Sequence, residues 1–124
     1  MARKARDDVV TNEGPGGMEA LAGRLRSAFE AGDLVALAGL LDPDVRWGGE
    51  EDTDQTCHNR AEVLARYEAL RARGVLVSVT EVSIERDAVV LGLDVTRPGG
   101  TEHRRVHQTF TVAGGLVVDI RPGG

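Results

Sequence analysis

The sequence predicts an α+β fold in which three amphipathic helices pack against an antiparallel sheet. Apolar residues recur at helical spacing in the first half of the chain, whereas four runs rich in Val, Ile, Leu and Thr follow in the second half. With 124 residues, the chain has the length of one domain with one core. Helices and strands that are segregated along the sequence in this way are typical of α+β domains.

The first two helices are predicted from one apolar stripe each. From Met18 onward, apolar side chains recur at helical spacing until Gly32, which supplies a helix stop. Asp33 can cap the start of the next helix, in which leucines repeat the stripe until Pro43 forbids its continuation. The stripes consist of Leu21, Ala22, Leu25, Ala28 and Phe29 in the first helix and of Leu34, Leu37, Leu40 and Leu41 in the second.

A short strand and a third helix complete the first half. Val45–Trp47 is strand-like and is closed by two glycines, and the acidic segment 50–54 is predicted to be a solvated loop. Asn59 suits the turn before a helix that carries Tyr67 on its apolar side and ends at Gly74.

The second half is predicted to be a sheet. Val75–Ile84 and Ala88–Thr96 should pair as a hairpin around a turn at residues 85–87. Two further strands, His103–Val112 and Leu116–Ile120, follow glycine-containing turns. Because all these connections are short, we expect neighbouring strands to run antiparallel.

Composition and motifs exclude several classes of partner and reaction. The chain has 15 Lys and Arg against 20 Asp and Glu, and its net charge of -5 repels polyanions, so no nucleic-acid partner is expected. No apolar run approaches the ~20 residues of a membrane span. Phosphate loops, Ser-His-Asp spacing and paired-Cys motifs are lacking, and we expect no cofactor. His103 and His107 share an outward strand face, but no carboxylate or Cys completes a ligand set, so no metal is expected.

The start of the chain predicts a leader and a cytoplasmic location. Residues 1–17 show no periodicity and end in Gly-Pro-Gly-Gly, so we expect a flexible leader before a domain at residues 18–124. Acidic and polar residues interrupt the stretch that a signal peptide needs to be apolar, so export is not indicated. The single Cys57 cannot form an internal disulfide, which fits a reducing cytoplasm.

Three segments carry a resemblance to a known family: Phe29–Asp33 between the first helices, Leu40–Trp47 entering the first strand, and Phe110–Arg121 across the last turn. In their order and spacing, the chain resembles the nuclear transport factor 2-like superfamily over Met18–Arg121. This superfamily includes SnoaL-like polyketide cyclases and ketosteroid isomerases. The resemblance implies a strongly curved, cone-shaped sheet around the helices, a cystatin-like α+β barrel, with a small hydrophobic ligand inside. It also implies a homodimer through the outer sheet face.

The resemblance allows a comparison with ketosteroid isomerase one position at a time. Leu25 stands where that enzyme has an oxyanion-binding Tyr, and Gly49 stands where it has the Asp that moves the substrate proton. Gln108 stands where it has a second oxyanion donor, a carboxylic acid, and an amide can still donate a hydrogen bond. Without the base and the first donor, we do not expect that isomerisation by that route.

Alternation along the third long strand predicts one polar residue inside the cone. Gln108 and Phe110 share the apolar strand face with Val106 and Val112. An unpaired buried amide costs about 1–3 kcal/mol, so Gln108 should bond either a ligand oxygen or a neighbouring side chain or water.

Trp47 and Tyr67 are the candidate walls of the pocket, and with Gln108 and Phe110 they form the predicted ligand-binding set. An aromatic ring suits a hydrophobic ligand. Plain core packing is the alternative for both rings, in which case the Tyr67 hydroxyl still needs a partner.

Cys57 and Asp94 are the candidate catalytic residues. Cys57 precedes His58, but neighbours on a loop point apart, which favours a buried Cys and a surface His. Asp94 would be a general acid or base if it faced the cone, whereas its parity with Leu93 and Val95 favours the solvated face.

Two functions follow from these expectations. The first is binding of a small apolar, oxygen-bearing molecule, with or without cofactor-free isomerase, cyclase or hydrolase chemistry. The second is a non-catalytic dimeric interaction module whose cone is filled by side chains. The state of the cone interior distinguishes them.

Overall fold

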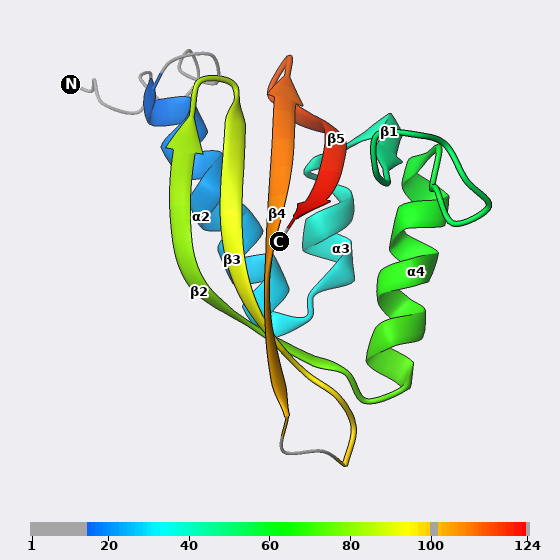
Figure 1. Cartoon of the computed structure of the whole chain (residues 1–124). Helices are drawn as coiled ribbons and strands as arrows, with labels where there is room; N and C mark the ends of the chain where they lie inside the picture. The colour runs from blue at the N-terminus through cyan, green and yellow to red at the C-terminus, as the bar shows by residue number, and fades with distance from the viewer. Residues whose placement is uncertain (1–14, 100–101, 124) are drawn as a thin grey trace.

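The computed structural model describes residues 15–99 and 102–123 (Figure 1). Most of the predicted leader therefore lies outside the described residues. The helices are α2 (Pro15–Ala31), α3 (Leu34–Ala38) and α4 (Arg60–Ala72). The strands are β1 (Leu41–Trp47), β2 (Leu76–Glu85), β3 (Ala88–Thr96), β4 (His103–Ala113) and β5 (Leu116–Gly123). The predicted α+β order is confirmed: two helices, a short strand, a third helix and then four long strands.

The strands form one sheet in the order β1-β5-β4-β3-β2. Strands β2 to β5 pair with their sequence neighbours in antiparallel fashion, as the short turns predict. β1 instead joins the edge beside β5 and runs parallel to it, with Leu41 opposite Val117 and Trp47 opposite Ile120. Helix α4 and three strands separate β1 from β5 in the sequence, which permits a parallel pairing.

Two helix boundaries differ from their predicted positions. α2 begins at Pro15, three residues before Met18, and proline is well tolerated in the first turn of a helix. The prediction that the second helix extends to Pro43 is wrong, because α3 ends at Ala38 with Gly39 as its C-cap. The buried side chain of Leu41 belongs to β1, whose position at the sheet edge tolerates Pro43.

The core lies between the concave face of the sheet and the helices. Figure 1 shows α2 and α3 behind the sheet and α4 standing beside β1. Alternate residues of β3 and β4 point inward and are buried, as strand periodicity predicts. The fully buried side chains include Leu25, Leu41, Val45, Val63, Val89, Leu91, Phe110, Val117 and Ile120. Within residues 15–99 and 102–123, no helix is both long and apolar enough to cross a membrane.

Truncation of Leu91 should measure the contribution of this core. Leu91 is completely buried, so Leu91→Ala should lower the free energy of unfolding by about 2–5 kcal/mol, through lost transfer energy and the cavity that remains. Val35 is 85% exposed, and Val35→Ala should change stability by no more than about 0.5 kcal/mol. Urea unfolding followed by Trp47 fluorescence gives both values. Equal losses of stability in Leu91→Ala and Val35→Ala would contradict the inward orientation of Leu91 on β3.

Candidate functional site

A cavity of about 360 Å³ opens between the helix ends and the sheet. It lies where the C-terminal ends of α2 and α4 meet α3, the start of β2, the end of β3 and the first half of β4. Its walls are predominantly apolar and include Ala28, Phe29, Leu34, Leu37, Trp47, Leu70, Val75, Val77, Leu93, Val95 and Val106. The cone is therefore hollow at this end, and its volume lies within the ~300–1,000 Å³ range of small-molecule sites.

A hydrogen bond between helix and sheet supplies the polar part of the cavity wall. The Tyr67 hydroxyl on α4 donates to Gln108 Oε1 on β4 at 3.3 Å, and both residues line the cavity. Gln108 is 9% exposed, as expected for an inward position on β4. Its amide nitrogen makes no hydrogen bond to the described residues. It is also not one of their polar side-chain atoms that are both buried and without a hydrogen-bond partner, so it remains accessible. This nitrogen can therefore donate to a molecule in the cavity.

Aromatic rings hold Tyr67 in place. Trp47 stacks on Tyr67 with ring centroids 4.5 Å apart, and Phe29 meets Tyr67 edge-on at 5.3 Å. The Arg66 guanidinium lies 5.3 Å from the centre of the Trp47 ring, a cation–π contact. Phe110 is fully buried and packs edge-on against Phe29 at 5.7 Å, outside the cavity lining. Trp47, Tyr67 and Gln108 thus come together at the cavity, and Phe110 supports them from the core.

The environment of Tyr67 keeps its hydroxyl protonated. Burial raises the pKa of the phenol far above its ordinary value, and the nearby Cys57 raises it further. Tyr67 is consequently a neutral hydrogen-bond donor at physiological pH. It has no tendency to act as a base there.

Cys57 sits behind the aromatic wall and does not line the cavity. Its backbone N–H and C=O both pair with Trp47 at 2.9 Å, and its side chain is only 3% exposed. Burial raises the pKa of the thiol, which lowers the population of the nucleophilic thiolate. The adjacent His58 ring points to Asp52 instead. The two neighbours do not form a nucleophile–base pair.

Asp94 lies on the outer face of the sheet, as its parity predicts. Its Oδ2 is 3.2 Å from His103 Nδ1, while its neighbours Leu93 and Val95 line the cavity on the other face. Asp94 Oδ1 is buried and has no hydrogen-bond partner among the described residues. Across residues 15–99 and 102–123, no cluster of three or more His, Cys, Asp or Glu side chains is arranged to hold a metal ion.

Residues 22–120 match the family model of the SnoaL-like domain. The chain belongs to the SnoaL-like family. No curated protein matches the sequence. The predicted superfamily is thereby confirmed, and the cone-shaped fold agrees with it.

Solved structures with the same fold have diverged widely from this SnoaL-like domain in sequence. A nuclear transport factor 2-like protein from Mesorhizobium loti is 15% identical, with a TM-score of 0.72 over 85% of this chain and 88% of that one. A candidate ketosteroid isomerase from Kribbella flavida is 21% identical, with a TM-score of 0.71 over 83% of this chain and 73% of that one. An LEH-like epoxide hydrolase from M. tuberculosis is 13% identical, with a TM-score of 0.65 over 83% and 78%. At such identities, the similarity shows the fold alone.

Two of the three positions compared with isomerase residues, Leu25 and Gly49, lie outside the cavity lining of this SnoaL-like domain, whereas Gln108 lines it. Leu25 is completely buried in the core, and Gly49 is exposed in the loop after β1. A side chain at Gly49 would meet open space. The sequence comparison at these positions therefore agrees with the geometry, because neither supplies a polar group to the cavity.

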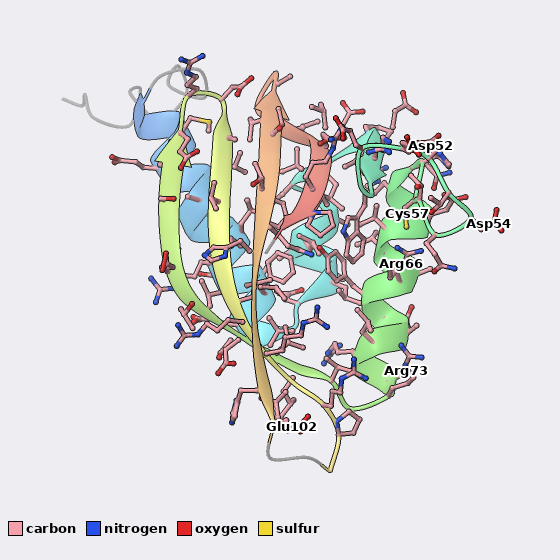
Figure 2. All side chains as sticks on the ribbon, viewed as in Figure 1. Asp52, Asp54, Cys57, Arg66, Arg73 and Glu102 are labelled. Carbon is pink, nitrogen blue, oxygen red and sulfur yellow. The ribbon has the colours of Figure 1, made fainter. Side chains whose placement is uncertain are left out.

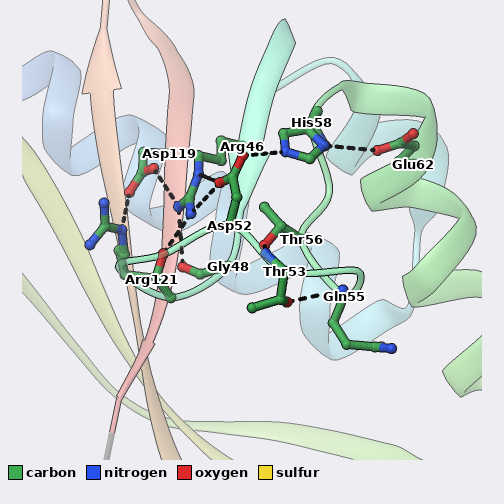
Figure 3. Close-up of polar contacts among 11 residues, drawn as sticks. Arg46, Gly48, Asp52, Thr53, Gln55, Thr56, His58, Glu62, Asp119 and Arg121 are labelled. Atoms are coloured by element: carbon green, nitrogen blue, oxygen red, sulfur yellow. Dashed lines mark hydrogen bonds and ion pairs between the residues drawn. The ribbon is translucent and has the colours of Figure 1, made fainter.

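The acidic loop after β1 is exposed, as the sequence predicted, and ion pairs hold it to the protein. Asp52 accepts hydrogen bonds from Arg46 at 2.9 and 3.1 Å and lies 2.9 Å from His58 Nε2 (Figure 3). Arg46 also donates to the Gly49 carbonyl at 2.6 Å and approaches Asp119 of β5 at 3.8 Å. The hydrogen bonds from His58 and Arg46 lower the pKa of Asp52.

Several residues that line the cavity mouth were not predicted. Glu30, Gly32 and Arg71 come from the junction of α2 with α3 and from the end of α4. The spacing of Tyr67 and Arg71, four residues apart on one helix, is the signal that could have placed Arg71 on the same face. Figure 2 shows the long axis of α4 from Cys57 near its start to Arg73 just beyond its end.

Asp52→Asn should loosen the loop behind Trp47. Because the pKa of Asp52 is lowered, its carboxylate stabilises the loop at pH values above 3.8, the ordinary pKa of the group. This stabilisation is lost as the pH falls from 3.8 through the lowered pKa. We expect the Trp47 and Cys57 amides to exchange about threefold faster in the variant at neutral pH. Asp54→Asn is the matched control, since Asp54 is exposed in the same loop (Figure 2). Unchanged exchange in Asp52→Asn would show that the ion pairs do not hold the loop.

Cys57 should be protected from alkylation in the folded domain. Its buried thiol with a raised pKa should react with iodoacetamide more than about tenfold slower than in the urea-unfolded chain. Mass spectrometry after timed quenching gives both rates. Rapid labelling of the native protein would mean that Cys57 reaches solvent and would restore it as a candidate nucleophile.

Proposed function

We propose that this SnoaL-like domain binds a small, mostly apolar molecule and holds an acceptor oxygen of that molecule on Gln108 and Tyr67. The observation that carries the proposal is the Gln108 amide nitrogen, which faces a hollow, apolar cavity without a hydrogen bond to the described residues. A carbonyl oxygen is the simplest group that satisfies it. The hollow cone counts against a side-chain-filled interaction module.

The hydrogen-bond inventory of the pair supports this ligand class. Gln108 Oε1 accepts the Tyr67 proton, so the amide N–H groups remain as donors. If the amide were turned over, its nitrogen would donate to Tyr67 and the phenol proton would become the available donor. Either arrangement presents a donor to the ligand. A buried donor left unpaired costs about 1–3 kcal/mol, which favours a ligand that carries an acceptor over a pure hydrocarbon.

Chemistry at this site would be cofactor-free and electrophilic. A donor on the carbonyl oxygen stabilises negative charge that develops there, as in isomerase, cyclase and hydrolase reactions. The titratable residues of the cavity lining besides Tyr67 are Glu30 and Arg71, both at the mouth. Glu30 is paired with Arg26 at 3.7 Å. We therefore propose binding as the primary activity, with polarisation of the bound carbonyl as the catalytic contribution.

We further propose that the domain forms a homodimer through the outer face of the sheet and acts in the cytoplasm. Arg105 lies opposite Asp94 in the sheet register, so the face carries both signs of charge. The unpaired, buried Cys57 is compatible with a reducing compartment.

Gln108→Leu should weaken binding of a ketone but not of the matching hydrocarbon. The probes are 1-indanone and indane, which share shape and differ in the carbonyl oxygen, and the readout is Trp47 fluorescence corrected against free N-acetyltryptophanamide. Loss of the hydrogen bond should raise the Kd for 1-indanone about five- to tenfold and leave that for indane within about twofold.

Thr109→Val is the matched control, because Thr109 follows Gln108 on β4 and is not in the cavity lining. It should leave both dissociation constants unchanged. Equal binding of 1-indanone and indane to the unaltered protein and to Gln108→Leu would overturn the anchoring role of the amide. No binding of either probe at any accessible concentration would count against the proposed function.

A further inference from the structure

We propose that the natural ligand is an oxo acid: an apolar molecule whose carbonyl reaches Gln108 and whose carboxylate binds Arg71 at the cavity mouth. This inference rests on the proposed function and deepens it by naming the substrate class. The observation that carries it is a cationic side chain that lines a predominantly apolar cavity on the same helix face as Tyr67.

The position of Arg71 follows from the geometry of α4. Arg71 and Tyr67 are four residues apart, so they lie on one face of the helix, about 6 Å apart along its axis. Both line the cavity. Tyr67, which is hydrogen-bonded to the Gln108 anchor, and the exposed cation therefore lie along the same helical wall of the cavity.

Gly32 leaves room for the Arg71 side chain at the turn between α2 and α3. Gly32 lies in the turn between α2 and α3 with a φ of +64°, and a Cβ there would stand 2.8 Å from Arg71 Nε and 3.3 Å from Arg71 Cζ. The positive φ favours glycine at this turn, and the absence of a side chain leaves room for the guanidinium beside it. Arg71 thus crosses from α4 to the α2–α3 junction and borders the mouth.

The charge of Arg71 is not neutralised by the described residues. Their ion pairs and side-chain hydrogen bonds include none with Arg71. Glu30 also lines the mouth, but its carboxylate lies 3.7 Å from Arg26. The carbonyl end of α2 is close by and favours a cation, which offers Arg71 a purely structural role. The experiment below separates that role from ligand binding.

Gln108 and Arg71 define the chemical groups that the ligand carries. A guanidinium binds a carboxylate through two parallel N–H···O bonds, and an ester or amide cannot reproduce this charged pair. A carbonyl for Gln108 and a carboxylate for Arg71, carried on an apolar body that fits the cavity, describe an oxo acid. No bond in the ligand needs to break for this recognition.

The test compares 5-oxo-5-phenylpentanoate with its methyl ester by Trp47 fluorescence. The unaltered protein should bind the acid about fivefold more tightly than the ester, and added salt should reduce this preference. Arg71→Gln should remove the preference and leave the affinity for the ester unchanged. Arg71→Lys should retain part of it, because the charge remains while the planar fork is lost. Arg73→Gln should behave like the unaltered protein, since Arg73 caps α4 outside the cavity lining.

The outcomes distinguish this inference from the proposed function. If the ester and the acid bind equally to the unaltered protein, the oxo-acid assignment is overturned while ligand binding stands. If neither binds, the proposed function and this inference both fall. If Arg71→Gln lowers the melting temperature but the protein still binds the acid about fivefold more tightly than the ester, Arg71 only stabilises the C-terminal end of α2 and the inference is wrong. A ratio that falls to about one in Arg71→Gln alone supports it.

Discussion

Gln108 is a polar residue on the concave face of β4, and the cone can keep it there only if its amide is hydrogen-bonded. Tyr67 meets part of this requirement from α4, so one hydrogen bond links the sheet to the helix layer across the hollow. The stacked Trp47 and the edge-on Phe29 fix the Tyr67 ring, and all three rings form part of the cavity wall. The apolar walls, the cavity and its polar anchor all depend on this arrangement.

This SnoaL-like domain has the fold of its family, but two of the positions compared with ketosteroid isomerase hold residues of different chemistry. Leu25 is part of the solid core, and position 49 in the loop after β1 is a glycine without a carboxylate. What remains at the cavity is a neutral amide and a phenol whose pKa burial raises, which are both donors. Such a site can bind and polarise an oxygen, but a proton transfer would need a base that the ligand or the cavity mouth supplies. Similarity to isomerases and hydrolases therefore describes the scaffold.

Local patterns were sufficient to predict the long strands, the inward face of β4 and the outward position of Asp94, because strand alternation acts within one element. Contacts between distant segments were not predictable in this way. The leucines before Pro43 satisfy a helical period, yet Leu41 is buried by pairing with Val117. Asp52 is exposed as predicted, but its contacts with Arg46 and His58 were not predictable from the sequence. Arg71 lies close to Gly32 at the end of another helix, a contact between distant segments that no local pattern indicates.

β5 follows every other strand in the sequence, yet it lies between β1 and β4 in the sheet. β1 has no neighbour in the sheet until residues 116–123 have left the ribosome. The helices and the β2–β3 hairpin can form earlier, but Trp47 at the end of β1 cannot take its place against them until then. A chain truncated before Leu116 would expose one open edge on β4 and leave β1 unpaired, which makes such fragments prone to aggregation.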